Sequence, residues 1–267
     1  KIALLQGRSP APYEYTQFVL CTTHQLLRFY HAFDVLIIDE VDSFPYAMNP
    51  ELHYATKQAR KLQGSTIYLT ATPDGKLLQQ SRQAKLATSY LTRRFHGHPL
   101  PEIKVVSGQN WMKKLRKGRL PSPLSRFIKE QIQAQRQFLI FVPKIEVLPK
   151  VLEALQQAFP TVKVLTVHAA DPERVAKVQM MRKQEIDALI TTTILERGVT
   201  FPGIDVAVLG ADDAVFSMAA LVQIAGRVGR SPQRPKGTVL FICPMLNRNI
   251  KRAQAQIKFM NRKASEC

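Results

Sequence analysis

The chain is poor in cysteine and acidic residues, and it has no long hydrophobic run. Its three cysteines, Cys21, Cys243 and Cys267, lie far apart without C-x-x-C spacing, so they indicate neither a disulfide framework nor a zinc site. No apolar run approaches the ~20 residues of a membrane-spanning helix, and no signal peptide opens the chain. Reduced thiols in a cytoplasmic protein are the simplest interpretation.

The shortage of acidic residues leaves a large positive charge. Against 20 Asp and Glu stand 38 Lys and Arg, which gives a formal net charge of +18. Self-repulsion on this scale is usually tolerated where a polyanionic partner supplies the counter-charge. Nucleic acid is the leading partner, and an anionic membrane surface is the competitor. We therefore expect a cytoplasmic location and leave open a peripheral association with the inner face of the membrane.

The pattern of apolar runs predicts an α/β fold. The 267 residues are enough for two domains of ordinary size. In the first part, the runs predict strands at 18–21, 35–38 and 66–69, and helices at 23–30 and 50–62. In the second part they predict strands at 138–142, 162–167, 188–191, 206–209 and 238–242. The helices between and after these strands are predicted at 123–135, 146–159, 172–184, 218–228 and 247–262.

Prolines and basic residues mark the boundary between the two domains. Between residues 92 and 125, four prolines punctuate a segment rich in lysine and arginine. This composition fits a linker and the first exposed elements of a new domain. We place the domains at residues 1–95 and 96–267. Because the chain opens at Lys1 in a strand-like run, we expect the first domain to lack its amino-terminal part.

An acidic cluster of Asp39, Glu40 and Asp42 follows the apolar run at 35–38. Such a run fits a strand buried on both faces of a parallel sheet, and ligands bind at the carboxyl ends of such strands. There Asp39 would hold Mg²⁺ and Glu40 would accept a proton from an attacking water, as nucleotide hydrolysis requires. Taken alone, the stretch also fits an ordinary strand followed by an acidic turn.

Two hydroxyl residues, Thr70 and Thr72, follow the strand predicted at 66–69. Because parallel strands end at the same edge of a sheet, these hydroxyls would lie beside the acidic cluster, hydrogen-bond its carboxylates and sense a phosphate. The sequence T-A-T-P is also a common way to end a strand in a proline-stopped loop.

A second hydroxyl run follows the strand predicted at 188–191. Thr191 and Thr192 would touch a nucleic-acid phosphate, and Gly198 would let the backbone approach it closely. A plain strand and loop fits this stretch equally well. In the first domain, Thr22, Thr23 and His24 are further candidates for contacts with a nucleic-acid backbone. His24 also fits as a residue that opens a helix.

The stretch Q-I-A-G-R-V-G-R at 223–230 places Arg227 and Arg230 three residues apart, on one face of a helix or its last turn. The planar guanidinium meets two oxygens at once and keeps its charge at any working pH, which suits it to clamp a γ-phosphate. An isolated stretch of this kind also fits a solvated basic turn. The four motifs in this order favour the phosphate interpretation.

In this order the motifs resemble the motor core of superfamily 2 helicases. The residues 39–42 resemble the Walker B element, Thr70 and Thr72 the coupling motif, and Gln223, Arg227 and Arg230 the arginine-finger motif. Further stretches at 22–30, 37–46, 94–101 and 195–202 resemble the ComFA family of competence ATPases.

The resemblance implies two RecA-like domains that use ATP and Mg²⁺, and a translocase of single-stranded DNA that serves DNA uptake in natural transformation. It implies partners in the competence machinery at a membrane DNA channel, while a homo-oligomer stays open. It also implies a set of nucleotide-binding residues, namely Asp42, Thr70, Thr72, Gly198 and Gln223.

The chain departs from the family pattern in two respects. It contains no G-x-x-x-x-G-K-[ST] loop, and the family's amino-terminal four-cysteine zinc element is also absent. We expect both, and any zinc, in sequence upstream of Lys1, so this chain alone should bind ATP poorly and hydrolyse little. Two alternatives stay open: a primosomal or RNA helicase of the same superfamily, and a non-hydrolysing scaffold that binds nucleic acid.

Overall fold

The computed structural model describes residues 1–7, 13–196 and 199–266. The chain divides into two compact units, Lys1–Thr88 and Ser89–Cys267, which are called unit 1 and unit 2 below. Among the described residues, no helix is long and apolar enough to cross a membrane.

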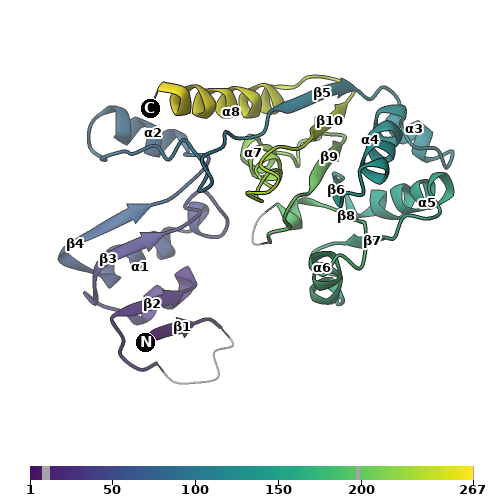
Figure 1. Ribbon diagram of the computed structural model, residues 1–267. Helices are drawn as coiled ribbons and strands as arrows, with labels where there is room; N and C mark the ends of the chain where they lie inside the picture. Colours follow the sequence, from purple (N-terminus) through teal and green to yellow (C-terminus); the bar gives the residue numbers. More distant parts are fainter. Residues whose placement is uncertain (8–12, 197–198, 267) are drawn as a thin grey trace. The chain divides into compact units, whose positions relative to one another are not determined.

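The described residues of unit 1 form two small parallel sheets and two α-helices (Figure 1). The strand β1 (Ile2–Leu5) pairs with β2 (Phe18–Cys21), and β3 (Phe33–Ile38) pairs with β4 (Arg60–Tyr68). The 3₁₀ helices η1 (Thr23–Arg28) and η2 (Tyr46–Met48) lie in the connections. The helix α1 (Pro50–Ala59) precedes β4, and α2 (Gly75–Arg82) follows it.

The helix boundaries in unit 1 follow from local chemistry. Asn49 caps α1 because its Oδ1 accepts hydrogen bonds from the backbone N–H groups of Glu51 and Leu52. At the other end, the backbone N–H groups of His31 and Ala32 donate to the carbonyls of Gln58 and Ala59. These contacts end the helix at Ala59, so the prediction of helix for residues 60–62 is wrong, and β4 begins there instead.

The core of unit 1 lies on one side of β3. Leu36 and Ile38 pack with Leu52 and Ala55 of α1. On the opposite side of the strand, Val35 and Ile37 are each 56% exposed. The prediction that this strand is buried on both faces is therefore wrong for the described residues, because α1 covers one face only of a two-stranded sheet.

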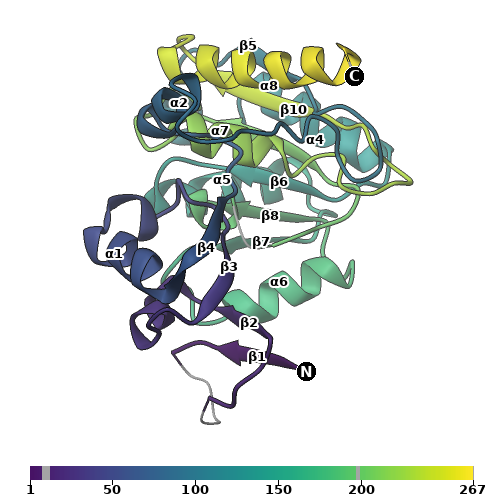
Figure 2. The same cartoon turned by 90° about the vertical axis from the view of Figure 1, so that its left-hand side faces the viewer.

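Unit 2 is built around a six-stranded parallel sheet with the order β5-β10-β9-β6-β8-β7. Figure 2 shows β10, β6, β8 and β7 stacked in that sequence. The strands are β5 (Ile103–Ser107), β6 (Phe138–Phe141), β7 (Val164–Val167), β8 (Ala188–Thr191), β9 (Asp205–Leu209) and β10 (Val239–Cys243). The helices are α3 (Trp111–Leu115), α4 (Ser122–Gln133), α5 (Leu148–Ala158), α6 (Arg174–Arg182), α7 (Met218–Ala225) and α8 (Arg248–Glu266), with η3 (Ile145–Val147) and η4 (Thr193–Leu195).

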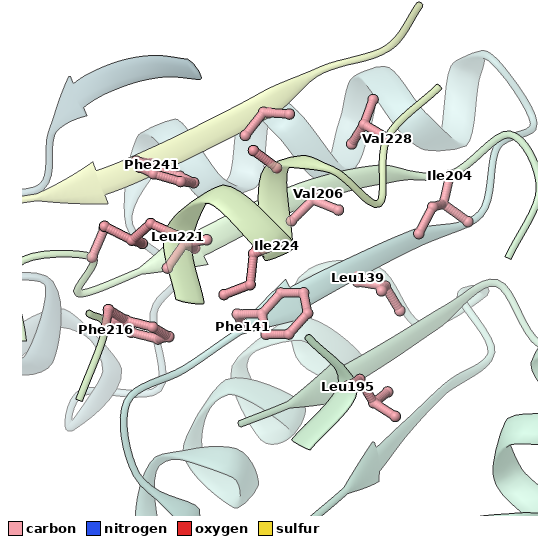
Figure 3. Close-up of a cluster of buried hydrophobic side chains, with 14 of the residues drawn as sticks. Leu139, Phe141, Leu195, Ile204, Val206, Phe216, Leu221, Ile224, Val228 and Phe241 are labelled. Atoms are coloured by element: carbon pink, nitrogen blue, oxygen red, sulfur yellow. The ribbon is translucent and has the colours of Figure 1, made fainter. Parts of the chain in front are cut away.

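Helices cover both faces of this sheet, as right-handed crossovers require. One apolar cluster joins the sheet to α6, α7 and α8, and a second joins it to α3, α4 and α5. In the first cluster, Leu221 and Ile224 of α7 lie over Phe141 and Val206 of the strands (Figure 3). All four side chains are fully buried. Burial of a side chain of this size contributes about 1.5–3 kcal/mol, so this packing holds α7 against the sheet.

The structure differs from the sequence prediction in two places at the start of unit 2. The units divide between residues 88 and 89, whereas we placed the boundary between 95 and 96. The segment we interpreted as a linker also contains β5, which pairs with β10 as an edge strand from Ile103 opposite Val239 to Ser107 opposite Cys243. The sheet therefore has six strands where the pattern predicted five. The α/β fold class is confirmed.

Candidate functional site

The acidic cluster of unit 1 lies at the carboxyl end of β3, as predicted. Asp39 is exposed, and its Oδ1 accepts the backbone N–H of Glu40 at 2.9 Å. Glu40 has a positive φ of 54°, so the chain turns sharply as soon as the strand ends. Backbone bonds between Leu69 and both Ile38 and Val41 hold this turn against the end of β4.

The hydroxyl pair after β4 is bound to Asp42. Thr70 Oγ1 donates to one carboxylate oxygen of Asp42 and Thr72 Oγ1 to the other, each at 2.6 Å. Thr70 Oγ1 also accepts the backbone N–H of Thr72 at 2.9 Å, which closes a small network. Thr72 is only 4% exposed. The expected contact between hydroxyls and carboxylates is present, and it is made by Asp42.

These residues suit a magnesium ion only together with a nucleotide. Among the described residues, no group of three or more His, Cys, Asp or Glu side chains could hold a metal ion. Mg²⁺ in nucleotide sites usually takes one or two carboxylates, with phosphate oxygens and water as the other ligands. Since both oxygens of Asp42 accept hydroxyl protons, the exposed carboxylate of Asp39 is the better candidate ligand.

The predicted arginines of unit 2 lie beyond the end of α7, because the helix stops at Ala225, three residues before the predicted end. Arg227 is 1% exposed, and its Nε donates to the carbonyl of Glu196 at 3.1 Å. Arg230 is half-buried, with Nε donating to the carbonyl of Gly226 at 3.0 Å and Nη1 to Thr200 Oγ1 at 3.2 Å. Gln223, on α7, is 8% exposed. Of the two predicted placements, a helical face or the last turn of a helix, the structure therefore fits the turn, which directly follows α7.

The candidate nucleic-acid contacts are unevenly placed. Thr22 and His24 are exposed at the carboxyl end of β2, and Thr23 is half-buried. In unit 2, Thr192 is half-buried, whereas Thr191 is fully buried at the end of β8. The side chain of Thr191 is thus not exposed for a contact with DNA. Gly198 lies outside the described residues.

The predicted residues therefore form two sets, one within unit 1 and one within unit 2. Asp39, Glu40, Asp42, Thr70 and Thr72 meet at one edge of unit 1. Gln223, Arg227 and Arg230 lie along and just after α7 of unit 2. The first set offers carboxylates and hydroxyls for a metal and a water, and the second offers guanidiniums for an anion.

The segment 226–230 after α7, which carries Arg227 and Arg230, is called the arginine loop. Two further residues contact this loop, and they were not predicted from the sequence as site residues. Arg94 and His96, in the segment interpreted as a linker, bind the carbonyls of Val228 and Gly229. Their only signal in the sequence was the stretch at 94–101, which carried part of the family resemblance.

The chain is similar to known proteins over most of its length. A model of the helicase conserved C-terminal domain matches residues 121–232, which include Gln223, Arg227 and Arg230. Competence protein ComFA of Streptococcus pneumoniae is 45% identical over 263 residues, which cover 98% of this chain and 61% of that protein. ComFA of Bacillus subtilis is 38% identical over 265 residues, which cover 99% of this chain and 57% of that protein. The chain is ComFA-like.

This ComFA-like chain spans about 60% of the length of the curated relatives it matches. Its fold resembles that of a Saccharomyces cerevisiae Dbp5 variant bound to RNA and ADP BeF3. The TM-score is 0.63 at 14% identity, with 97% of this chain and 67% of that chain covered. The predicted resemblance to a superfamily 2 helicase and the predicted RecA-like α/β fold are both confirmed.

Proposed function

We propose that this ComFA-like chain is part of an ATP-driven motor that moves single-stranded DNA during DNA uptake in natural transformation. The observation that carries the proposal is the pair of residue sets on RecA-like units, carboxylates with hydroxyls in one and guanidiniums in the other. The similarity to ComFA over nearly the whole chain supports the assignment to competence. The net charge of +18 supports a polyanionic track.

Each residue set has a defined chemical role in this proposal. Glu40 takes the proton from the attacking water, and Arg227 and Arg230 offset the charge that develops on the γ-phosphoryl group. Asp39 would hold Mg²⁺, which when bound neutralises phosphate charge. The bonds from Thr70 and Thr72 fix Asp42, so a change at the phosphate edge is transmitted to the segment after β4.

The chain contains no G-x-x-x-x-G-K-[ST] loop, and this limits how well the chain alone can bind and hydrolyse ATP. Without that loop the β- and γ-phosphates lose most of their backbone donors, so this chain alone should hydrolyse little ATP. We propose that turnover requires the full-length protein. Partners among competence proteins at a membrane DNA channel, a cytoplasmic location and zinc bound by upstream cysteines belong to the same proposal.

The central test compares two variants of the full-length protein. Glu40→Gln keeps the size of the side chain and removes the proton acceptor, so we expect ATP turnover to fall at least about 100-fold while affinity for single-stranded DNA is unchanged. Glu51→Gln is the matched control, because Glu51 lies in the first turn of α1, where a loss of charge should not affect turnover. Turnover that survives Glu40→Gln would remove Glu40 from this role.

The identity of the track is tested in the same assay. We expect oligodeoxynucleotides to stimulate turnover of the full-length protein more than RNA of the same sequence. Stronger stimulation by RNA would favour an RNA helicase of the same superfamily. Binding of DNA without any hydrolysis by the full-length protein would favour the scaffold.

A further inference from the structure

The segment at residues 90–103, most of which lies in the stretch 92–125 predicted to begin with a linker, is bound to α8 along its length. The ring of Tyr90 meets that of Phe259 with centroids 5.8 Å apart. The backbone N–H of Leu100 donates to Asn261 Oδ1 at 2.8 Å, and Asn261 Nδ2 donates back to the Leu100 carbonyl at 3.0 Å. Arg93 Nη2 donates to the carbonyl of Ala264 at 2.9 Å. This segment is therefore a fixed part of unit 2.

Between these contacts, two side chains of the segment reach the arginine loop. Arg94 Nη1 donates to the carbonyls of Val228 and Gly229, each at 2.6 Å. His96 Nε2 contacts the Gly229 carbonyl at 2.9 Å. Because the backbone N–H of His98 points to His96 Nδ1 at 3.3 Å, Nδ1 is the acceptor and Nε2 carries the proton. Three hydrogen bonds thus hold the two carbonyls that precede Arg230.

The loop is packed tightly at Gly229. This residue has a positive φ of 73°, and a Cβ atom there would lie 2.2 Å from the Pro235 carbonyl oxygen and 2.7 Å from Arg94 Nη1. Only glycine accepts both the backbone conformation and the close approach. Because Arg230 is the next residue, any shift of the Gly229 peptide moves its guanidinium group.

We propose that Arg94 and His96 are positioning residues, which hold the Val228–Gly229 backbone so that Arg230 is presented to the γ-phosphoryl group of ATP. This inference rests on the proposed function and adds two residues to it. Neither residue needs to touch the nucleotide, since both act through the two carbonyls.

The electrostatics of Arg94 support this role. Burial, and secondly the charge of Arg230, lower the pKa of Arg94 to about 10. Its Nη2 is buried without a hydrogen-bond partner among the described residues. Both features are unfavourable for the unit by itself. A buried cation beside a second cation is favourable where an anion binds close by, as a triphosphate would.

The first experiment measures ATP turnover by the full-length protein stimulated with single-stranded DNA. For Arg94→Ala we expect a fall in kcat of about 10- to 100-fold, since misplacement of a catalytic group by about 1 Å costs up to this much, with KM for ATP changed less than about three-fold. Arg94→Lys should keep most of the activity, because an ammonium group has three donors and can serve both carbonyls. Arg93→Ala is the matched control, because the guanidinium of Arg93 binds the Ala264 carbonyl of α8 and, among the described residues, makes no hydrogen bond to the arginine loop.

His96 provides a second and milder variant should Arg94→Ala fail to fold. His96→Ala removes one bond to Gly229, and His96→Gln restores a donor. We expect kcat to fall in the first variant and to recover in the second. Equal losses of kcat in Arg94→Ala and Arg93→Ala, or no rescue by lysine and glutamine, would overturn the proposal.

A double-mutant cycle decides whether Arg94 acts through Arg230. If it does, Arg94→Ala should lower kcat in the natural background and have no further effect in the Arg230→Ala background. An equal fold-loss in both backgrounds would contradict a positioning role while leaving the proposed function intact. A full-length protein without any DNA-stimulated turnover would instead refute the proposed function itself.

Discussion

The carboxylate of Asp205, at the start of β9, is the most consequential buried charge in unit 2. It is 0% exposed, and its two oxygens have separate partners. Oδ2 pairs with Arg234 Nη2 at 2.6 Å, and Oδ1 accepts the backbone N–H of Thr238 at 2.6 Å. Arg234 Nη1 donates in addition to the carbonyl of Gly203. Asp205 thereby ties the segment that follows Arg230 to the centre of the sheet.

The magnitude of its contribution follows from these contacts. Removing one partner of a buried ion pair typically costs about 3–5 kcal/mol. We expect Asp205→Ala to lower the free energy of unfolding of unit 2 by that amount, because Arg234 and the Thr238 N–H lose their acceptor. Asp205→Asn keeps an acceptor for Thr238 and loses the charge, so about 2–3 kcal/mol is expected. In a domain of 150–250 residues, 3–5 kcal/mol corresponds to a fall in Tm of about 6–20 °C.

The assay is urea unfolding of this chain followed by tryptophan fluorescence. Trp111 is the only tryptophan and lies in unit 2, where its ring packs on Gly210, so the signal reports on unit 2 alone. Asp187→Asn is the matched control, because Asp187 also precedes a strand and accepts one backbone N–H, from Lys163, but is exposed. We expect it to cost less than about 1 kcal/mol. Equal costs for Asp187→Asn and Asp205→Asn would refute the reasoning.

Two further predictions concern a glycine and a cysteine of unit 2. Gly229→Ala should lower the free energy of unfolding by about 1–3 kcal/mol more than the control Gly97→Ala. Both residues have a positive φ, but of the two only Gly229 has neighbours with which a Cβ would collide. Equal losses of free energy in urea unfolding would contradict this. Burial, and secondly the charge of Asp212, raise the pKa of Cys243 to about 11. At pH 8 roughly one Cys243 thiol in a thousand is then ionised. Iodoacetamide should therefore label Cys243 only in the urea-unfolded chain, as measured by mass spectrometry. Rapid labelling of Cys243 in the native chain would count against the burial argument.

The alternation of apolar runs and helical stretches was enough to predict the α/β class, because four of the five predicted strands of unit 2 contain an apolar run of three or more residues. β5 lacked that signal, since Ile103–Ser107 contains Lys104 and follows two prolines. Its partner β10 is 136 residues further along the chain, and local pattern carries no information on such a pairing. The same limit explains the misassigned end of α1, whose last carbonyls are satisfied by His31 and Ala32.

The candidate site shows the same division between local and tertiary information. The order of motifs predicted Asp39, Asp42, Thr70 and the arginine loop as candidates, because each follows a strand or helix that could be recognised. Which carboxylate binds the threonines depends on the turn at Glu40 and was not predictable. Burial of Thr191 depends on what packs over the end of β8, so its hydroxyl was wrongly expected to be accessible.

The arginine loop is held on both sides by bonds that do not involve a ligand. Before Arg230, the carbonyls of Val228 and Gly229 are bound by Arg94 and His96. After it, Arg234 is paired with the buried Asp205. In the proposed function, a loop fixed in this way has little freedom to rearrange when a nucleotide binds, because unit 2 itself already orients the guanidinium of Arg230. Preorganisation of this kind is what makes a charged group effective in stabilising a transition state, because no reorganisation is needed at the moment of reaction.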